Sequence, residues 1–137
     1  MDNKLQILDC TLRDGGYYTN WDFSSELVQN YIIAMDDLPI DYIEIGYRNL
    51  PHKNYHGEFF YCPISTIDHL NSLTKIPLAI ILNEREIKID DIQELLLPCI
   101  DKVKMVRIAI DPKNFSSAIE MAKKIKEMGF EVAFNVM

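Results

Sequence analysis

The chain has 137 residues, 48% of them hydrophobic and only five of them glycine, so it can form one domain with a substantial core and is not disordered. Its formal net charge of −7 argues against nucleic acid or an anionic membrane as a partner. No apolar run has the length of a membrane span and no signal peptide precedes the first strand, while the odd number of cysteines, three, fits reduced thiols. We therefore expect a cytoplasmic protein.

The chain begins with a predicted strand over residues 7–12, in which apolar and polar side chains alternate. Gly15-Gly16 follows and is typical of a turn, which places Arg13 and Asp14 at the carboxyl end of that strand. Parallel α/β proteins carry their chemistry at this end of their strands. A carboxylate beside a guanidinium suits a divalent metal together with an anionic substrate group.

Strand and helix patterns then alternate to the end of the chain, in units the size of a βα repeat. In chain order we expect a helix capped by Ser24 or Ser25 and stopped by Pro39, a strand at 41–47, a loop at 48–62, a short helix at 63–73, a strand at 77–82, a helix from Asp90-Asp91 to Cys99, a strand at 104–110, a helix from Asp111-Pro112 to Gly129, and a strand at 131–137. The first of these helices shows an apolar face made of Leu27, Tyr31, Ala34, Met35 and Leu38, and the last shows one made of Phe115, Ala118, Ile119, Ala122 and Ile125.

Two architectures share this pattern, an open doubly wound sheet and a slice of a TIM barrel. One side of the strands is apolar: Leu8, Cys10, Leu12, Ile43, Ile45, Val106, Ile108, Val132 and Phe134. The other side is polar: Asp9, Thr11, Arg13, Glu44, Arg107 and Asn135, with Asn83 just past the third strand. A sheet buried on both faces would not tolerate this row, because a buried charge without a partner costs several kcal/mol. We therefore expect an α/β fold of parallel (β/α) repeats, the amino-terminal half of a TIM (β/α)8 barrel with about five strands and four helices.

The run Asp-Cys-Thr-Leu-Arg-Asp-Gly at residues 9–15 resembles the opening strand of the HMG-CoA-lyase-like family of metal-dependent barrels. That family includes 4-hydroxy-2-oxovalerate aldolase and the isopropylmalate and homocitrate synthases. The longer run through Tyr17, Tyr18, Asn20 and Trp21 is most similar to a bacterial branch named after 4-hydroxy-2-oxovalerate aldolase. The resemblance extends along the whole chain, which covers about half of a family member. It implies that residues 1–137 are the amino-terminal part of a TIM-barrel aldolase or lyase catalytic domain and that the chain is truncated.

The resemblance also implies a function, a divalent-metal-dependent aldolase or lyase that forms or cleaves a C–C bond next to a small 2-oxo acid through a metal-bound enolate. Asp14 would be a ligand of Mn²⁺ or Mg²⁺, Arg13 would stabilise the enolate, and Glu44 would orient them. The chemistry of these side chains permits the roles, because a hard carboxylate suits either ion and a guanidinium donates to an enolate oxygen without losing its proton. We expect the polar row to bind the substrate through Arg13, Asn83, Arg107 and Asn135.

Two departures from the family pattern bear on activity. Where the aldolases have a basic His three residues after the Asp, this chain has Tyr17, which can position a substrate or relay a proton but is a poor base with its ordinary pKa of about 10. The family completes its metal site with a His-x-His pair on a late strand, and this chain has no such pair. Its own His52 and His56 lie in a Pro-, Asn- and Gly-containing loop that we expect to be solvated, and His69 is expected on a helix surface. We therefore predict that the chain alone binds metal weakly and is inactive.

Two alternatives to the enzyme remain at this point. A half-barrel could have lost catalysis and serve as a binding or assembly module. A nucleotide-binding α/β domain is disfavoured because no Gly-rich phosphate loop follows the first strand. Whether the half-barrel is part of an enzyme or an assembly module, its sheet has two open edges. We therefore expect a homo-oligomer in which copies of the chain contact each other near Val132, Phe134 and Val136.

Overall fold

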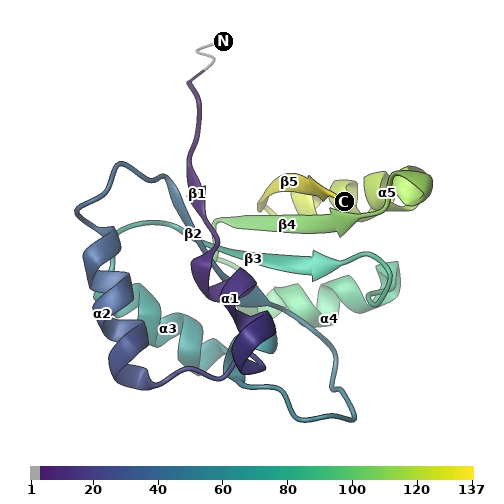
Figure 1. The fold of residues 1–137 in the computed structure, drawn as a ribbon. Coiled ribbons are helices and arrows are strands. Elements are labelled where there is room, and N and C mark those ends of the chain that lie inside the picture. Colours follow the sequence, from purple (N-terminus) through teal and green to yellow (C-terminus); the bar gives the residue numbers. More distant parts are fainter. Residues whose placement is uncertain (1–3) are drawn as a thin grey trace.

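The computed structural model describes residues 4–137, in which five parallel strands form a single curled sheet (Figure 1). The strands are β1 (Leu8–Asp9), β2 (Tyr42–Tyr47), β3 (Leu78–Asn83), β4 (Met105–Ile110) and β5 (Glu131–Val136). Their order in the sheet follows their order in the chain, β1-β2-β3-β4-β5. A doubly wound sheet would reverse its order at a switch point, whereas a barrel adds each strand beside the last. The prediction of half of a (β/α) barrel is confirmed.

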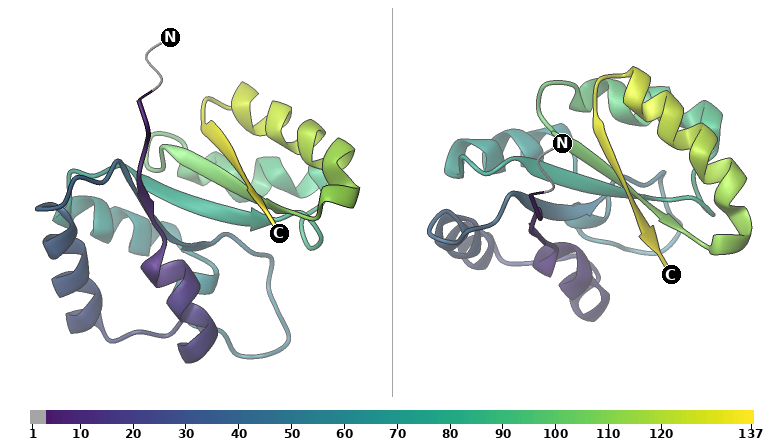
Figure 2. Two further views of the ribbon diagram at one scale, coloured as in Figure 1. Left: turned by 45° about the horizontal axis from the view of Figure 1, so that its top comes forward. Right: turned by 90° about the horizontal axis from the view of Figure 1, so that it is seen from above.

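Five α-helices connect these strands: α1 (Thr11–Thr19), α2 (Ser25–Met35), α3 (Ile64–Leu73), α4 (Ile92–Leu96) and α5 (Phe115–Glu127). Helices α2 to α5 match the four expected helices and lie along the outer side of the curled sheet (Figure 2). The large core forms between that row and side chains such as Ile43, Ile80 and Ile108. The opposite, concave side holds a small apolar cluster around Tyr42 and Met105. None of the helices in residues 4–137 is long and apolar enough to cross a bilayer.

Helix α1 is the element that the sequence did not predict. The first strand was expected to run to residue 12, but β1 ends at Asp9. The Asp9 carboxylate then accepts hydrogen bonds from the backbone N–H of Thr11 (3.0 Å) and from its hydroxyl (3.1 Å). These bonds turn the chain into a helix, and the predicted glycine turn lies inside it. Gly16 is required there because a Cβ would lie 2.0 Å from Cδ1 of Trp21.

The sides of the first strand are also opposite to the prediction. Leu8 pairs with Tyr42, and both line the concave side together with Cys10. Asp9 pairs with Ile43 on the helix side, where its carboxylate accepts a hydrogen bond from the Tyr31 hydroxyl of α2. The reason is that β1 has only two residues, so its pairing with β2, and not its own alternation of apolar and polar residues, decides which side each residue faces. The predicted sides hold for the other strands: Ile43, Ile45, Val106 and Ile108 are in the core with Val132 and Phe134 packed against it, and Glu44, Arg107 and Asn135 lie on the concave side.

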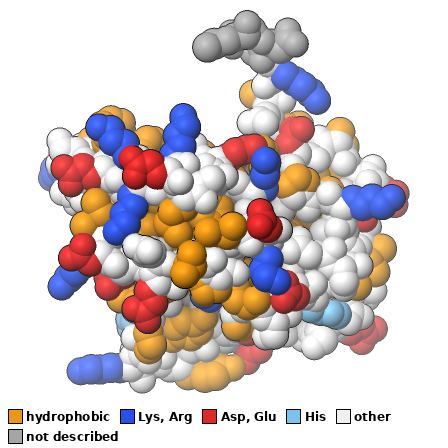
Figure 3. All heavy atoms as spheres, turned by 180° about the vertical axis from the view of Figure 1, so that it is seen from behind, with side chains coloured by type: hydrophobic (Ala, Val, Ile, Leu, Met, Phe, Trp, Pro, Cys, Tyr) orange, Lys and Arg blue, Asp and Glu red, His pale blue; other side chains and the backbone are white. Residues whose placement is uncertain are grey.

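Helices α2 and α5, the first and last of the row on the outer side of the sheet, bury less of their apolar surface than expected. Helix α2 buries Val28 and Ile32, one residue round from the predicted face, and leaves Leu27 about half exposed. The helix ends at Met35, so Leu38 lies beyond it and is also about half exposed. Helix α5 buries Ala118 and Ile125 as predicted but leaves Phe115 and Ile119 partly exposed. Among the described residues each end helix has a helix neighbour on one side only, so part of its apolar face has nothing to pack on. On the back of the molecule, hydrophobic side chains gather among charged ones (Figure 3).

Candidate active site

Three charged side chains meet on the concave side of the sheet. Glu44 on β2 is fully buried, and its two oxygens accept hydrogen bonds from two arginines. Arg13 Nε of α1 donates to Oε1 at 2.8 Å, and Arg107 Nη1 of β4 donates to Oε2 at 3.0 Å. The predicted grouping of these three residues is thus present in the structure. A single carboxylate fixes the positions of two guanidinium groups that come from different elements.

The buried part of this cluster carries an excess of positive charge. Two arginines face one carboxylate, and the fourth charge, Asp14, contacts Arg13 Nη1 at 3.1 Å but is 69% exposed and therefore well screened. Burial by itself lowers the pKa of Arg13, but the hydrogen bond and charge of Glu44 outweigh this effect, so the pKa is raised. The Arg13 guanidinium thus stays charged. Such a surplus suits an anionic ligand group.

A cavity of about 430 Å³ opens beside the cluster on the concave side. Its polar wall is formed by Arg13, Arg107 and Asn135, and its apolar wall by side chains such as Leu8 and Met105. Asn135 lies on the same side of the sheet as Arg107 and further toward the carboxyl ends of the strands. A cavity with a few convergent polar groups and an apolar wall is typical of a small-molecule site.

A pair of tyrosines lies beside Arg13 but is not part of the cavity lining. The hydroxyl oxygens of Tyr17 on α1 and Tyr47 on β2 are 2.8 Å apart. Trp21 packs edge-on against both rings, with centroid distances of 4.7 Å to Tyr17 and 5.8 Å to Tyr47, and its indole N–H donates to the Arg13 carbonyl at 2.9 Å. Trp21 thereby links the tyrosine pair to the backbone of the arginine.

Sequence reasoning overlooked Tyr47 for a structural reason. In a regular strand, residues three positions apart face opposite sides, so Glu44 on the concave side predicts Tyr47 on the helix side. The pairing of β2 with β3 shifts between Glu44 and Gly46, however. Glu44 then pairs with Ala79 and Tyr47 with Ile81, two residues apart on β3, so both face the same side. Gly46 at the shift lets the loop approach, since a Cβ there would lie 1.9 Å from the carbonyl oxygen of Phe59.

Asp14 and Asn83 are placed differently from the rest. Asp14 is exposed at the edge of α1, an accessible hard oxygen ligand of the kind that suits Mg²⁺ or Mn²⁺. No group of three His, Cys, Asp or Glu side chains in residues 4–137 could hold a metal ion. Asn83 is not among the residues that line the cavity; its Oδ1 accepts the backbone N–H of Arg85 at 3.1 Å and stabilises a turn.

The long loop after β2 packs more tightly than predicted. His56 is only partly exposed and stacks on Phe60, with ring centroids 3.9 Å apart, so the expectation that it is solvated is wrong. His52 and His69 are exposed, as expected for these two. The loop is joined to the end of α1 by backbone hydrogen bonds, from Gly57 to Asn20 at 2.7 Å and from Phe59 to Trp21 at 3.3 Å.

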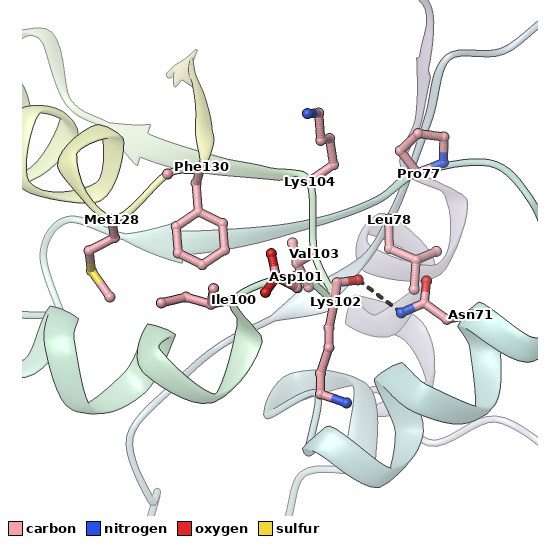
Figure 4. A pocket seen from close by; sticks show the side chains of 11 residues that line it. Asn71, Pro77, Leu78, Ile100, Asp101, Lys102, Val103, Lys104, Met128 and Phe130 are labelled. Atoms are coloured by element: carbon pink, nitrogen blue, oxygen red, sulfur yellow. Dashed lines mark hydrogen bonds between the residues drawn. The ribbon is translucent and has the colours of Figure 1, made fainter.

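A second hollow, of about 410 Å³, lies at the opposite, amino-terminal end of strands β3 to β5 (Figure 4). Its floor is mainly apolar, with Phe130 and Leu78 in view, and the Lys102 backbone carbonyl accepts a hydrogen bond from Asn71 at 2.8 Å. The lysines at its rim are engaged elsewhere, Lys102 with Asp68 and Lys104 with Glu131. In barrel enzymes residues at this end contribute stability, and chemistry occurs at the other end.

Comparison with known proteins was made on sequence and on structure. No family model and no curated protein sequence matches the chain. A solved structure does: the crystal structure of the N-terminal domain of a putative aldolase from Bacteroides vulgatus has a TM-score of 0.95 and 59% sequence identity over 97% of this chain. The chain covers 44% of that one. The match shows that this chain has the fold of that domain and spans less than half of the matched chain.

Proposed function

We propose that the chain is the amino-terminal half of a divalent-metal-dependent aldolase or lyase that forms or cleaves a C–C bond next to a small 2-oxo acid. The observation that carries this proposal is the buried Arg13–Glu44–Arg107 cluster at the wall of an open cavity. Similarity to the Bacteroides vulgatus domain supports the choice of an aldolase. Within residues 4–137, Nη2 of Arg13 has no protein partner, so it is available to a ligand.

In this proposal the two arginines bind the negative charge of the substrate. Glu44 holds each guanidinium in place before the ligand arrives, which removes the cost of ordering two long side chains on binding. Arg13 donates to the oxygen on which charge develops as the enolate forms and keeps its own proton, while the proton lost from the donor carbon passes to water. Arg107 and Asn135, which lie on the same polar wall of the cavity as Arg13, bind the carboxylate of the 2-oxo acid.

Proton transfer in this proposal belongs to Tyr17. When the enolate carbon bonds to the carbonyl carbon of an aldehyde, the electron pair of that C=O bond moves to its oxygen. Tyr17 gives its hydroxyl proton to this oxygen and regains one from water. A neutral phenol suits this acid step because it carries a proton that it can donate.

Mn²⁺ or Mg²⁺, when bound, would supply Lewis-acid polarisation of the ketone. Asp14 would be its ligand from this chain, and the remaining ligands would come from the substrate, water or residues outside this chain.

The test is an assay of the full-length protein with Mn²⁺ or Mg²⁺ and a panel of 2-oxo acids and aldehydes. We expect turnover, and a loss of about 10²–10³ in kcat/KM for Arg13→Lys, the effect of removing a fixed donor to a developing charge. Arg85→Lys is the matched control, because Arg85 makes only an exposed ion pair with Asp111. Absence of turnover with every pair of substrates would overturn the proposal and favour the alternative, a half-barrel that serves in assembly.

A further inference from the structure

The hydrogen bond between Tyr17 and Tyr47 joins a buried tyrosine to an exposed one. Tyr47 is 6% exposed and Tyr17 is 61% exposed. Their oxygens are 2.8 Å apart, and either hydroxyl could be the donor on distance alone. Within the described residues the Tyr47 hydroxyl has no other hydrogen-bond partner. The surroundings of the two hydroxyls therefore decide which one donates.

Only one of the two arrangements satisfies both protons. If Tyr17 donated, the Tyr47 proton would be left buried without an acceptor, which is costly. If Tyr47 donates, its proton is satisfied and the Tyr17 proton points to solvent or to a ligand. Burial, followed by the hydrogen bond to Tyr17, raises the pKa of Tyr47, so its proton is retained. The buried tyrosine is thus a fixed donor to the exposed one.

The backbone beside this tyrosine pair is strained, and surrounding contacts hold it in that conformation. Trp21, the residue that packs on both tyrosine rings, has a left-handed φ of 56°, and Asn20 before it has one of 54°. A bulky residue in this conformation is unfavourable and persists only where surrounding contacts hold it. The contacts are present: the Trp21 N–H donates to the Gly16 carbonyl at 3.0 Å, and the Trp21 carbonyl accepts from Phe59.

We propose that Tyr47 is a positioning residue that donates its hydroxyl hydrogen bond to Tyr17 and so directs the Tyr17 proton toward the carbonyl oxygen of the substrate. The proposal rests on the proposed lyase function. When Tyr17 has given up its proton, the bond from Tyr47 also stabilises the phenolate oxygen, because hydrogen bonds to charged acceptors are the stronger ones. Tyr47 itself neither loses a proton nor touches the substrate.

The direction of the hydrogen bond can be tested on this chain without any activity. Tyrosine labelled with ¹³C in the ring allows a hydroxyl proton that exchanges slowly with water to be assigned by its through-bond coupling to ring carbons. We expect one such proton on Tyr47, hydrogen-bonded to Tyr17, and we expect it to exchange rapidly in Tyr17→Phe. Assignment of the protected proton to Tyr17 would overturn the proposal.

The catalytic consequence is tested in the full-length protein with Tyr17→Phe, Tyr47→Phe and the double variant. Tyr47→Phe should lower kcat at least about tenfold with KM unchanged, since one hydrogen bond to a developing charge is lost. The double variant should be no slower than Tyr17→Phe alone, because Tyr47 acts only through Tyr17. Tyr18→Phe, which removes the hydroxyl of an exposed tyrosine on the same helix, should leave kcat unchanged. A Tyr47→Phe effect that persists in the Tyr17→Phe background would overturn the proposal.

These outcomes separate the inference from the function on which it rests. If the wild-type protein turned over no substrate, the lyase proposal would fail, and the labelled-tyrosine experiment would still decide the direction of the bond. If the wild type were active and Tyr47→Phe equally active, the lyase function would stand and the role of Tyr47 would be refuted.

Discussion

The substitution Glu44→Gln should strongly destabilise the fold. The side chain is fully buried, and each carboxylate oxygen accepts a hydrogen bond from an arginine whose own side chain is largely buried. Glutamine keeps one acceptor oxygen but turns an NH₂ group toward the other guanidinium and leaves both positive charges unbalanced. Hydrogen bonds to charged groups contribute about 1.5–3 kcal/mol each, and breaking a buried ion pair costs about 3–5 kcal/mol. We expect a loss of about 3–5 kcal/mol in the free energy of unfolding, against about 5–15 kcal/mol for a typical domain.

Urea denaturation followed by far-UV circular dichroism at pH 7 measures this loss as a fall in the transition midpoint at unchanged m value. Asp68→Asn is the matched control, because its carboxylate pairs with Lys102 at the surface and is half exposed. It should cost no more than about 1 kcal/mol. If Glu44→Gln cost no more than this control, the argument that a desolvated carboxylate holds the two arginines would be refuted.

The structure also sets the effect of one glycine substitution, the dependence of stability on pH and the oligomeric state of the chain. Gly16→Ala should lower the free energy of unfolding by about 1–3 kcal/mol in urea titrations, because the added methyl group overlaps the Trp21 ring; an unchanged midpoint would show that the ring can move. Burial and hydrogen bonding raise the pKa of Tyr31 and Tyr47, so the contribution of these two tyrosines to stability is complete below the ordinary tyrosine pKa of about 10 and falls as pH rises above it. Absorbance at 295 nm should show both tyrosines ionising only as the ellipticity is lost. The open edge at β5, where Val136 is 60% exposed, should make the chain a dimer or larger oligomer, which light scattering would contradict if it found a monomer at high micromolar concentration.

Local sequence patterns were sufficient to locate most of the fold. Strands β2 to β5 and helices α2 to α5 follow from runs of apolar side chains, helix caps such as Ser24, and breaks such as Gly129 with its φ of 99°. The same patterns placed Glu44, Arg107 and Asn135 on one side of the sheet. This worked because successive side chains in a regular strand point to alternate sides of the sheet, and because paired residues of neighbouring strands point to the same side.

The first twenty residues were harder to predict because their structure depends on partners elsewhere in the chain. The alternation over residues 7–12 is a strand pattern, yet the chain turns into α1 after Asp9, whose orientation comes from the pairing with β2 and the hydroxyl of Tyr31. Arg13 nevertheless reaches Glu44, as predicted, but from a helix.

The tyrosine pair was decided by tertiary structure alone. Tyr47 faces Tyr17 only because the register of β2 against β3 shifts by one residue. Gly46 inside the strand is the sequence signal for a bulge, but it does not specify which strand residues turn to the other side. The shift is accommodated by Gly46 under the Phe59 carbonyl, thirteen residues further along, and Trp21 supports the pair through contacts with that same loop. Composition and periodicity specify which face of a strand is apolar, whereas contacts between distant segments decide where that face turns.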